Sequence, residues 1–162
     1  MVDTTNIRKI FFYNTLIVVL IFLLDRISKF YVLNLYESFG EVNISITSFL
    51  NINFIWNKGI AFGFLSVESQ FFYTLITVII ILVLAAIILL AFYKKGIERL
   101  CYLGIIGGAS GNVFDRLYYN SVIDFIDISI KNFHWFIFNI ADIFICLGVT
   151  ILIFLEFFKK NT

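Results

Sequence analysis

Four long apolar runs separated by polar segments account for most of the chain. The run from Phe71 to Tyr93 has 23 residues without a charge, which is enough to cross the ~30 Å hydrocarbon core of a membrane at ~1.5 Å per helical residue. The first run, from Ile10 to Leu24, continues past Asp25. No small-residue cleavage site follows this run, so we expect a retained transmembrane helix and not a signal peptide. Together with the runs from Leu100 to Phe114 and from Trp135 to Phe158, the pattern predicts four transmembrane helices.

The polar segment between the first two runs has the period of β-strands. Apolar and polar residues alternate from Val42 to Thr47 and again from Leu50 to Trp56, which is typical of half-buried strands. The stretch from Gly59 to Leu65 is apolar and aromatic, as suits a segment at a membrane interface. We therefore expect a mainly α membrane protein with a small extracytoplasmic β-sheet module, or cradle, between the first two helices. Its single domain covers residues 1–162, with 37–70 as cradle and lid and 118–134 as an outer loop.

Composition and charge support a membrane protein and exclude other classes. Hydrophobic residues make up 61% of the chain, charged residues only 14%, and the mean hydropathy is +0.99, whereas soluble domains are about 45–50% apolar and about 25% charged. The net charge of +1 and the scattered basic residues provide no groove for nucleic acid, which is not an expected partner. One His and two Cys are too few for a zinc site, so we expect no metal and no cofactor.

The distribution of basic residues predicts the orientation of the helices. Seven of the 12 basic residues flank the apolar runs at ends that four crossings place on one side: Arg8, Lys9, Lys94, Lys95, Arg99, Lys159 and Lys160. Because cytoplasmic segments carry the excess of Lys and Arg, both termini are expected in the cytoplasm.

Three aspartates of the predicted helices share one depth. Asp25, Asp115 and Asp142 each lie 16 or 17 residues from a basic anchor, about 24–26 Å from the cytoplasmic end at ~1.5 Å per residue. Polar companions share their helix faces: Lys29 with Asp25, Asn112 with Asp115 and Arg116, and Asn139 with Asp142. Asp142 is expected six or seven residues inside its helix with no cation on its own face. A carboxylate in that environment is a functional candidate.

Two carboxylates held together can divide the work of hydrolysis. Neighbouring like charges raise one pKa and lower the other, so the ionised partner activates a water while the protonated partner polarises a carbonyl. Without a Ser/His pair, a metal cluster or a phosphate-binding loop, an aspartyl dyad is the hydrolytic machinery that the residues permit. Simpler interpretations stay open for the other acids: a structural ion pair of Asp25 with Lys29, a supporting role for Asp115 with Arg116, and a solvated loop position for Asp124.

Five short motifs resemble those of a known family. They are, in chain order, Asp25-Arg26-Ile27-Ser28-Lys29, Asn57-Lys58-Gly59-Ile60-Ala61-Phe62, the run from Gly107 to Arg116, Val122-Ile123-Asp124-Phe125, and Phe138-Asn139-Ile140-Ala141-Asp142. With five motifs in the same order on a four-span chain of this length, the probability of a chance match is very small. The chain is similar to the bacterial lipoprotein signal peptidases, the signal peptidase II family.

The resemblance implies an aspartic endopeptidase of the bacterial inner membrane that removes signal peptides from prolipoproteins, cutting before a diacylglyceryl-modified Cys. By motif it implies Asp124 and Asp142 as the catalytic pair, whereas depth alone would also allow Asp115. It implies substrate binding by Asn57, Asn112, Arg116 and Asn139, and structural support by Asp25, Lys29 and Asp115. It further implies an active site near the outer leaflet, contact with membrane lipid, a monomeric state and inhibition by globomycin-type cyclic peptides.

Two other functions are compatible with acids inside a membrane. A small proton-coupled transporter also uses such acids, but its polar residues form a path across the membrane instead of gathering at one depth. A noncatalytic scaffold would leave the buried polar groups without a purpose. Incubation of the purified protein with a lipidated prolipoprotein separates a protease from both.

Overall fold

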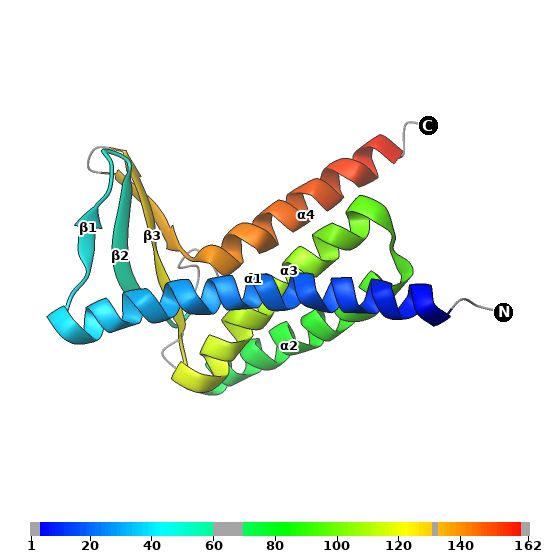
Figure 1. Cartoon of the computed structure of the whole chain (residues 1–162). Coiled ribbons are helices and arrows are strands. Elements are labelled where there is room, and N and C mark those ends of the chain that lie inside the picture. The colour runs from blue at the N-terminus through cyan, green and yellow to red at the C-terminus, as the bar shows by residue number, and fades with distance from the viewer. Residues whose placement is uncertain (1–3, 60–69, 131–132, 160–162) are drawn as a thin grey trace.

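The computed structural model describes residues 4–59, 70–130 and 133–159 of the chain. Within these residues the elements are α1 (Thr4–Phe39), β1 (Asn43–Ser45), β2 (Leu50–Asn57), α2 (Gln70–Tyr93), α3 (Gly96–Tyr119), β3 (Val122–Ile130), β4 (Phe133–Phe138) and α4 (Ile140–Lys159). The fold is mainly helical, with a small antiparallel sheet at one end of the helices (Figure 1). Apart from Gly59, the expected lid stretch from Gly59 to Leu65 lies outside the described residues.

Helix α3 lies at the centre of the bundle and packs against α1, α2 and α4. Small residues permit this close approach between helices. A Cβ atom added at Gly107 would lie 2.8 Å from the Cβ of Ile21 in α1, and one at Gly108 would meet the carbonyl oxygen of Ala141 in α4. These two glycines therefore set how closely α3 approaches its neighbours.

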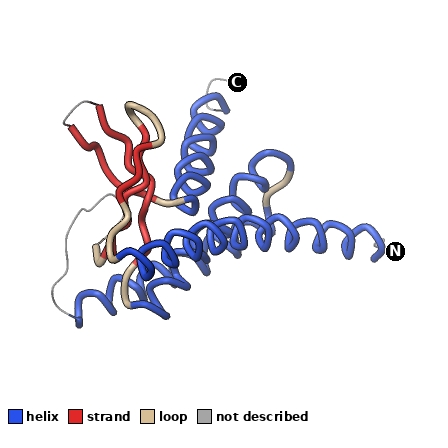
Figure 2. Tube along the Cα trace, turned by 60° about the vertical axis from the view of Figure 1, so that its left-hand side comes forward, coloured by secondary structure: helices blue, strands red, loops and turns tan. Residues whose placement is uncertain are grey.

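Helix α1 is longer than a membrane span, and its C-terminal part supports the sheet. Its 36 residues correspond to about 54 Å of helix, against ~30 Å of hydrocarbon. The strands follow the order β1-β2-β3-β4, each antiparallel to its neighbour. Figure 2 shows the strands gathered beside the helices. Apolar side chains of α1 and the sheet form one buried cluster: Val32, Leu33, Val42, Phe54, Ile123 and Phe125. Burial of these side chains, at roughly 1.5–3 kcal/mol each, fixes the sheet to the end of the helix.

Half of the described strands come from a segment in which no strand was expected. The strands expected at 42–47 and 50–56 are confirmed as β1 and β2. Residues 118–134 are not an outer loop, because they contain β3 and the start of β4, so the sheet extends beyond the connection between the first two helices. The run from Trp135 to Phe158 is not a single helix either, because β4 covers 133–138 and α4 begins at Ile140.

The sequence of β3 contains strand signals that the prediction of an outer loop did not use. Val, Ile and Phe dominate it, and these residues favour strands. Its described residues are almost all buried, including Asp124 and Asp127. Apolar and polar residues alternate from Ile126 to Ile130, as in a strand, but the apolar pairs Val122-Ile123 and Phe125-Ile126 interrupt this period in the first half of β3. The pairing with β2 and β4 therefore decided the structure of this segment.

Among the described residues, α2 and α4 are long and apolar enough to cross a membrane by length and composition. Only 11% of the apolar window of α2 and 17% of that of α4 are buried inside the protein. Apolar surface on this scale is stable against lipid and not against water. These features fit a membrane protein.

Candidate active site

Asp124 and Asp142 lie beside one cavity where the helices meet the sheet. Asp124 is on β3 and Asp142 is in the first turn of α4, and the two residues are only 1% and 7% exposed. Asp124 is therefore not a solvated loop acid. Its carboxylate oxygens accept hydrogen bonds from the side-chain amides of Asn139 at 2.6 Å and Asn57 at 2.8 Å.

Asn139 and Asp142 cap the start of α4 reciprocally. The side-chain oxygen of Asn139 accepts the backbone N–H of Asp142 at 3.1 Å, and the Asp142 carboxylate accepts the backbone N–H of Asn139, also at 3.1 Å. This arrangement is a capping box, with Asn139 as the N-cap residue. Asp142 is thus not six or seven residues inside a helix. It lies at the N-terminal end of α4, where the helix dipole favours negative charge.

The side chains of Asn112 and Asn139 join the two aspartates in one network. Nδ2 of Asn112 donates to Asp142 at 2.8 Å, and Oδ1 of Asn112 accepts from Nδ2 of Asn139 at 3.2 Å. The same Nδ2 of Asn139 donates to Asp124. The position of each carboxylate is therefore coupled to that of the other through two amides.

Lys29 is fully buried behind this network. Its Nζ lies 3.0 Å from Asp25, 2.8 Å from Asp115 and 2.8 Å from Oδ1 of Asn112, so each of the three ammonium donors has an acceptor. Asp25 also accepts the backbone N–H of Ala141 at 3.0 Å, one of the donors that the first turn of a helix leaves free. The expected Asp25–Lys29 ion pair is confirmed, but it belongs to a larger network that joins α1, α3 and α4.

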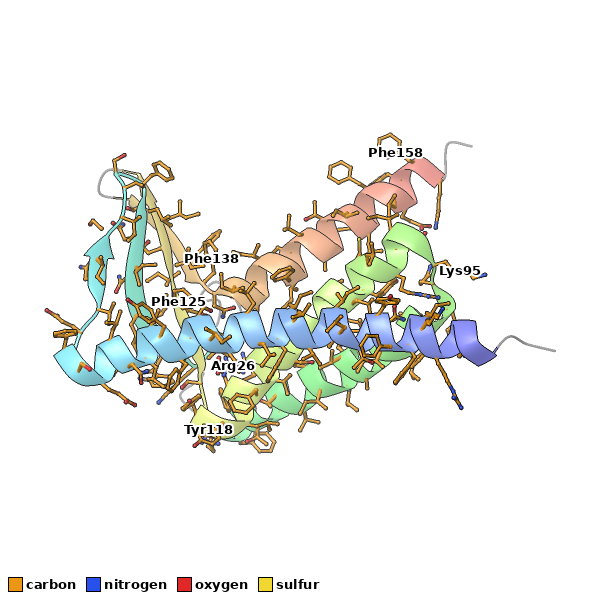
Figure 3. The ribbon with its side chains drawn as sticks, in the orientation of Figure 1. Arg26, Lys95, Tyr118, Phe125, Phe138 and Phe158 are labelled. Atoms are coloured by element: carbon orange, nitrogen blue, oxygen red, sulfur yellow. The ribbon has the colours of Figure 1, made fainter. Side chains whose placement is uncertain are left out.

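Asp115 connects the buried cations to the strand that carries Asp124. Its carboxylate lies 2.6 Å from Arg26 and accepts the backbone N–H of Ile123 at 3.2 Å. Ile123 immediately precedes Asp124, so this hydrogen bond fixes β3 at the site. Arg26, midway along α1 (Figure 3), was not among the expected site residues. Its place inside the Asp25–Lys29 motif was the signal that could have revealed it.

Arg116 and Asn57 hold the turn that follows β2. The Arg116 guanidinium donates to the carbonyl of Gly59 and lies over the ring of Tyr73, 5.3 Å from the ring centroid. Asn57 accepts the N–H of Gly59 at 2.8 Å through its side-chain oxygen, while its amide donates to Asp124. Tyr73 could not be singled out from the sequence, because it is one aromatic residue among many. Arg116 and Asn57, two of the four predicted substrate-binding residues, therefore lie at the site.

The cavity beside the aspartates has a volume of about 420 Å³. Its polar end is lined by Asn57, Asn112, Arg116, Asp124 and Asp142. Its walls are apolar and come from α2 (Ile79, Ile80, Val83, Leu84, Ile87), α3 (Ile105, Ala109) and α4 (Ile145, Cys146, Val149). An apolar cavity with a few convergent polar groups is the usual form of a ligand site.

Burial, and after it the negative charge of Asp142, raises the pKa of Asp124 from 3.8 to about 7, against the opposite effect of the amides of Asn57 and Asn139. Near neutral pH, Asp124 is therefore divided between its protonated and ionised forms, whereas an exposed aspartate would be ionised. In a pair of neighbouring carboxyl groups, the neutral carboxyl can polarise a carbonyl while the ionised carboxylate activates a water molecule. Within the part of the chain that the structure describes, no three His, Cys, Asp or Glu side chains are grouped to hold a metal ion.

The chain is similar to known proteins over most of its length. The family described as signal peptidase (SPase) II matches residues 17–158. A lipoprotein signal peptidase of Pelagibacter ubique (strain HTCC1062) is 46% identical over 153 residues, which cover 94% of this chain and 92% of the relative. One of Blochmanniella pennsylvanica (strain BPEN) is 42% identical over 151 residues, with 88% and 89% covered.

A solved structure has the same fold. It is described as a bacterial membrane enzyme at 2.3 Å resolution, and it matches with a TM-score of 0.69 at 31% identity, covering 93% of this chain and 90% of that one. A second bacterial membrane enzyme structure, at 1.9 Å resolution, matches with a TM-score of 0.69 at 29% identity. Together with the extent of the family match, these similarities show that the chain belongs to the signal peptidase II family of proteases.

Proposed function

We propose that Asp124 and Asp142 are the catalytic aspartates of this protease. The observation that carries the proposal is the position of Asn139, which donates to Asp124 through its side chain while it caps the helix turn that holds Asp142. This residue keeps two carboxylates from different elements at the polar end of one cavity. Asp115 is neutralised by Arg26 and Lys29, so we assign it, together with Asp25 and Lys29, to structural support.

In the reaction that we propose, Asp124 starts protonated and Asp142 ionised. The raised pKa of Asp124 favours its neutral form, and the N-terminus of α4 favours charge on Asp142. Asp142 takes a proton from water as the water oxygen attacks the scissile carbonyl, and Asp124 donates its proton to the carbonyl oxygen. The tetrahedral intermediate then returns a proton to Asp124 and breaks its C–N bond, while Asp142 protonates the departing amine.

Asn57, Asn112, Arg116 and Asn139 surround the reacting peptide in this proposal. The first three line the cavity, and Asn139 positions the two carboxylates from behind. Nη1 of Arg116 is buried with no hydrogen-bond partner among the described residues. Such a donor is costly unless a ligand satisfies it, so we assign it to a carbonyl oxygen of the bound peptide.

The substrate that we propose is a prolipoprotein, cut just before its diacylglyceryl-modified Cys. The relatives are named as lipoprotein signal peptidases, and the apolar walls of the cavity suit the apolar segment of a signal peptide. The two acyl chains of the Cys would contact membrane lipid beside the cavity. Burial of both parts of the substrate would place the scissile bond at the aspartates.

We further propose that α1 to α4 all cross the inner membrane of a bacterium, with both termini in the cytoplasm. Lys95 lies at the end of the helices opposite the sheet (Figure 3), and the described basic residues of the helix ends are Arg8, Lys9, Lys94, Lys95, Arg99 and Lys159. Their excess on this side favours a cytoplasmic location. The aspartates are then near the outer leaflet. We expect the protein to act as a monomer and to be inhibited by globomycin-type cyclic peptides.

The deciding experiment incubates the purified protein in detergent with a synthetic prolipoprotein that carries the diacylglyceryl-modified Cys. The wild-type protein should release the signal peptide, detected by mass spectrometry. Asp124→Asn and Asp142→Asn should each reduce turnover by about 10³-fold or more, because an amide cannot exchange the proton. Glu37→Gln, the same change at an exposed position of α1, should leave turnover unchanged. Near wild-type turnover by Asp124→Asn would reject the catalytic pair.

A further inference from the structure

A second groove lies between α1, α2 and α3, on residues that the proposed reaction does not use. Its volume is about 200 Å³. It is lined by Phe11, Asn14, Thr15 and Val18 of α1, by Ile88, Ala91 and Phe92 of α2, and by Leu103 and Ile106 of α3. None of these residues lines the cavity beside the aspartates. The groove is therefore separate from the cavity beside the aspartates.

The groove becomes more polar toward the end of the bundle that lies away from the sheet. Along α1, Val18 is about 14 Å and Asn14 about 8 Å from Lys9 at ~1.5 Å per residue. Asn14 is half-buried, and its amide has no hydrogen-bond partner within the described residues. An amide in a membrane-spanning segment needs such a partner. A ligand of this groove should therefore be apolar at one end and carry a hydrogen-bond acceptor at the level of Asn14.

Cations flank the polar end of the groove on two sides. Arg8 lies three positions before Phe11 on the same face of α1, while Lys94 and Lys95 follow Phe92 in the turn between α2 and α3. Lys94 pairs with Glu98 at 3.2 Å. Arg8 and Lys9 are exposed and form no ion pair in the part of the chain that the structure describes. Exposed cations at a membrane surface attract anionic lipid headgroups.

We propose that this groove binds one anionic phospholipid, in the cytoplasmic leaflet if the orientation proposed above holds. An acyl chain fills the apolar part, a glycerol ester carbonyl accepts a hydrogen bond from Asn14, and the phosphate lies near Arg8 and Lys95. The order of chain, ester and phosphate in the lipid is the order of apolar, amide and cationic groups along the groove. The same cations repel the positively charged start of a signal peptide, so the substrate is not the occupant.

The position of the groove gives the lipid a structural role. The sheet and the buried ion network hold the helices together at the end where the aspartates lie. At the other end of the bundle, the described side chains of α1, α2 and α3 leave a groove between them. A bound acyl chain would fill it and connect three helices by packing. The protein with this lipid bound should therefore resist thermal unfolding better than the lipid-free protein.

Native mass spectrometry of the purified full chain tests the proposal with three probes. These are phosphatidylglycerol, phosphatidylcholine with the same acyl chains, and glycerol 3-phosphate. Phosphatidylglycerol should bind as one copy at least tenfold more tightly than phosphatidylcholine, and glycerol 3-phosphate should not bind measurably. Equal binding of the two lipids, or binding of glycerol 3-phosphate as tight as that of the anionic lipid, would overturn the proposal. No cleavage is measured, so failure here would leave the proposed protease function intact.

Matched variants locate the site. Ala91→Phe puts a ring into the groove at a buried position and should weaken phosphatidylglycerol binding at least tenfold, whereas Ala86→Phe, on an exposed part of the same helix, should not. Arg8→Gln combined with Lys95→Gln should abolish the preference for the anionic lipid, while Lys9→Gln, on the opposite face of α1, should keep it. If Ala91→Phe fails to fold, the Arg8 and Lys95 variant decides alone. Unchanged selectivity in that variant would refute the site.

Discussion

The ammonium group of Lys29 lies 2.8 Å from the side-chain oxygen of Asn112, and this contact fixes the direction of the Asn112 amide. Because a cation attracts the oxygen, the NH₂ group must point the other way, and it donates to Asp142 at 2.8 Å. The same ammonium neutralises Asp25 and Asp115. One buried cation therefore pairs two supporting carboxylates and orients the donor to a proposed catalytic one.

The direction of this amide predicts the effect of Asn112→Asp. The new carboxylate can still accept from Lys29, so the fold should survive, but it presents an oxygen to Asp142 in place of a donor. We expect kcat/KM to fall by about 10²-fold or more with little loss of thermal stability. Asn43→Asp makes the same change at an exposed position of β1, which pairs only with β2 among the described strands, and should leave kcat/KM unchanged. A variant of Asn112 that cleaves normally would contradict the role of this amide.

The raised pKa of Asp124 predicts how activity depends on pH. Activity requires the protonated form of Asp124, which is lost as the pH rises through about 7. We therefore expect kcat/KM to fall above pH 7, approaching tenfold per pH unit, when it is measured with a substrate that has no group titrating in this range. A profile that stays flat from pH 6 to pH 9 would be incompatible with Asp124 as the proton donor.

The same pKa predicts a pH-dependent effect of Asp124→Asn on stability. Between its ordinary pKa of 3.8 and about 7, the folded protein holds a proton on Asp124 that the unfolded chain has released. The stability from this proton is complete below 3.8 and is lost as the pH rises through 7. Asparagine stays neutral throughout, so the Tm of the variant relative to the wild type should be higher at pH 8 than at pH 5. Thermal unfolding in detergent at both pH values measures this, and an equal Tm difference would count against the burial of the charge.

Close packing of Gly111 against Asp25 predicts the effect of a single methyl group. A Cβ atom at Gly111 would collide with the Asp25 carboxylate, which holds Lys29 and the start of α4. Gly111→Ala should therefore lower the free energy of unfolding by about 1–3 kcal/mol and reduce cleavage as well. Gly104→Ala on the same helix is the control, because its Cβ would meet only a carbonyl oxygen at 3.8 Å. Equal Tm values for the two variants would contradict this account.

The sequence predicted elements well wherever one physical signal dominated. Apolar length was sufficient for α2, and alternation was sufficient for β1 and β2. The start of α4 was misplaced because apolar residues lie on both sides of Asn139, so that the sequence of β4 and α4 resembles one apolar run. Asn139 and Asp142 lie three positions apart ahead of an apolar run, which is the sequence signal of a capping box and could have placed this boundary.

The candidate site was harder to predict than the fold. Asp142 is distinctive in the sequence because it has no neighbouring cation, whereas Asp124 has no such signal and was singled out by the family resemblance alone. The contacts of Asp115 with Arg26 and with the backbone of Ile123 depend on how α1 and β3 pack on α3. Tertiary packing brings these groups together, so spacing along one helix could not reveal them.

The last prediction concerns the lipid on the substrate. The aspartates lie at the junction of helices and sheet, and the cavity walls that lead to them are apolar. In the proposed orientation, the apolar helix of a signal peptide reaches this level from the cytoplasmic side. Two acyl chains on the adjacent Cys would fix the same bond from the outer leaflet, with each buried CH₂ contributing ~0.8 kcal/mol to anchoring. Anchoring from both sides should orient the carbonyl as well as increase binding.

We therefore expect kcat/KM to be at least about 10²-fold higher for a diacylglyceryl-modified prolipoprotein than for the same sequence with an unmodified Cys. Both substrates should be measured in the same detergent above its micelle concentration, so that partition into micelles is comparable. A substrate with a single acyl chain should fall between them, because each chain contributes separately to the position of the bond. Equal kcat/KM values for the modified and unmodified substrates would show that the enzyme does not use the lipid. The apolar cavity would then recognise the signal peptide alone.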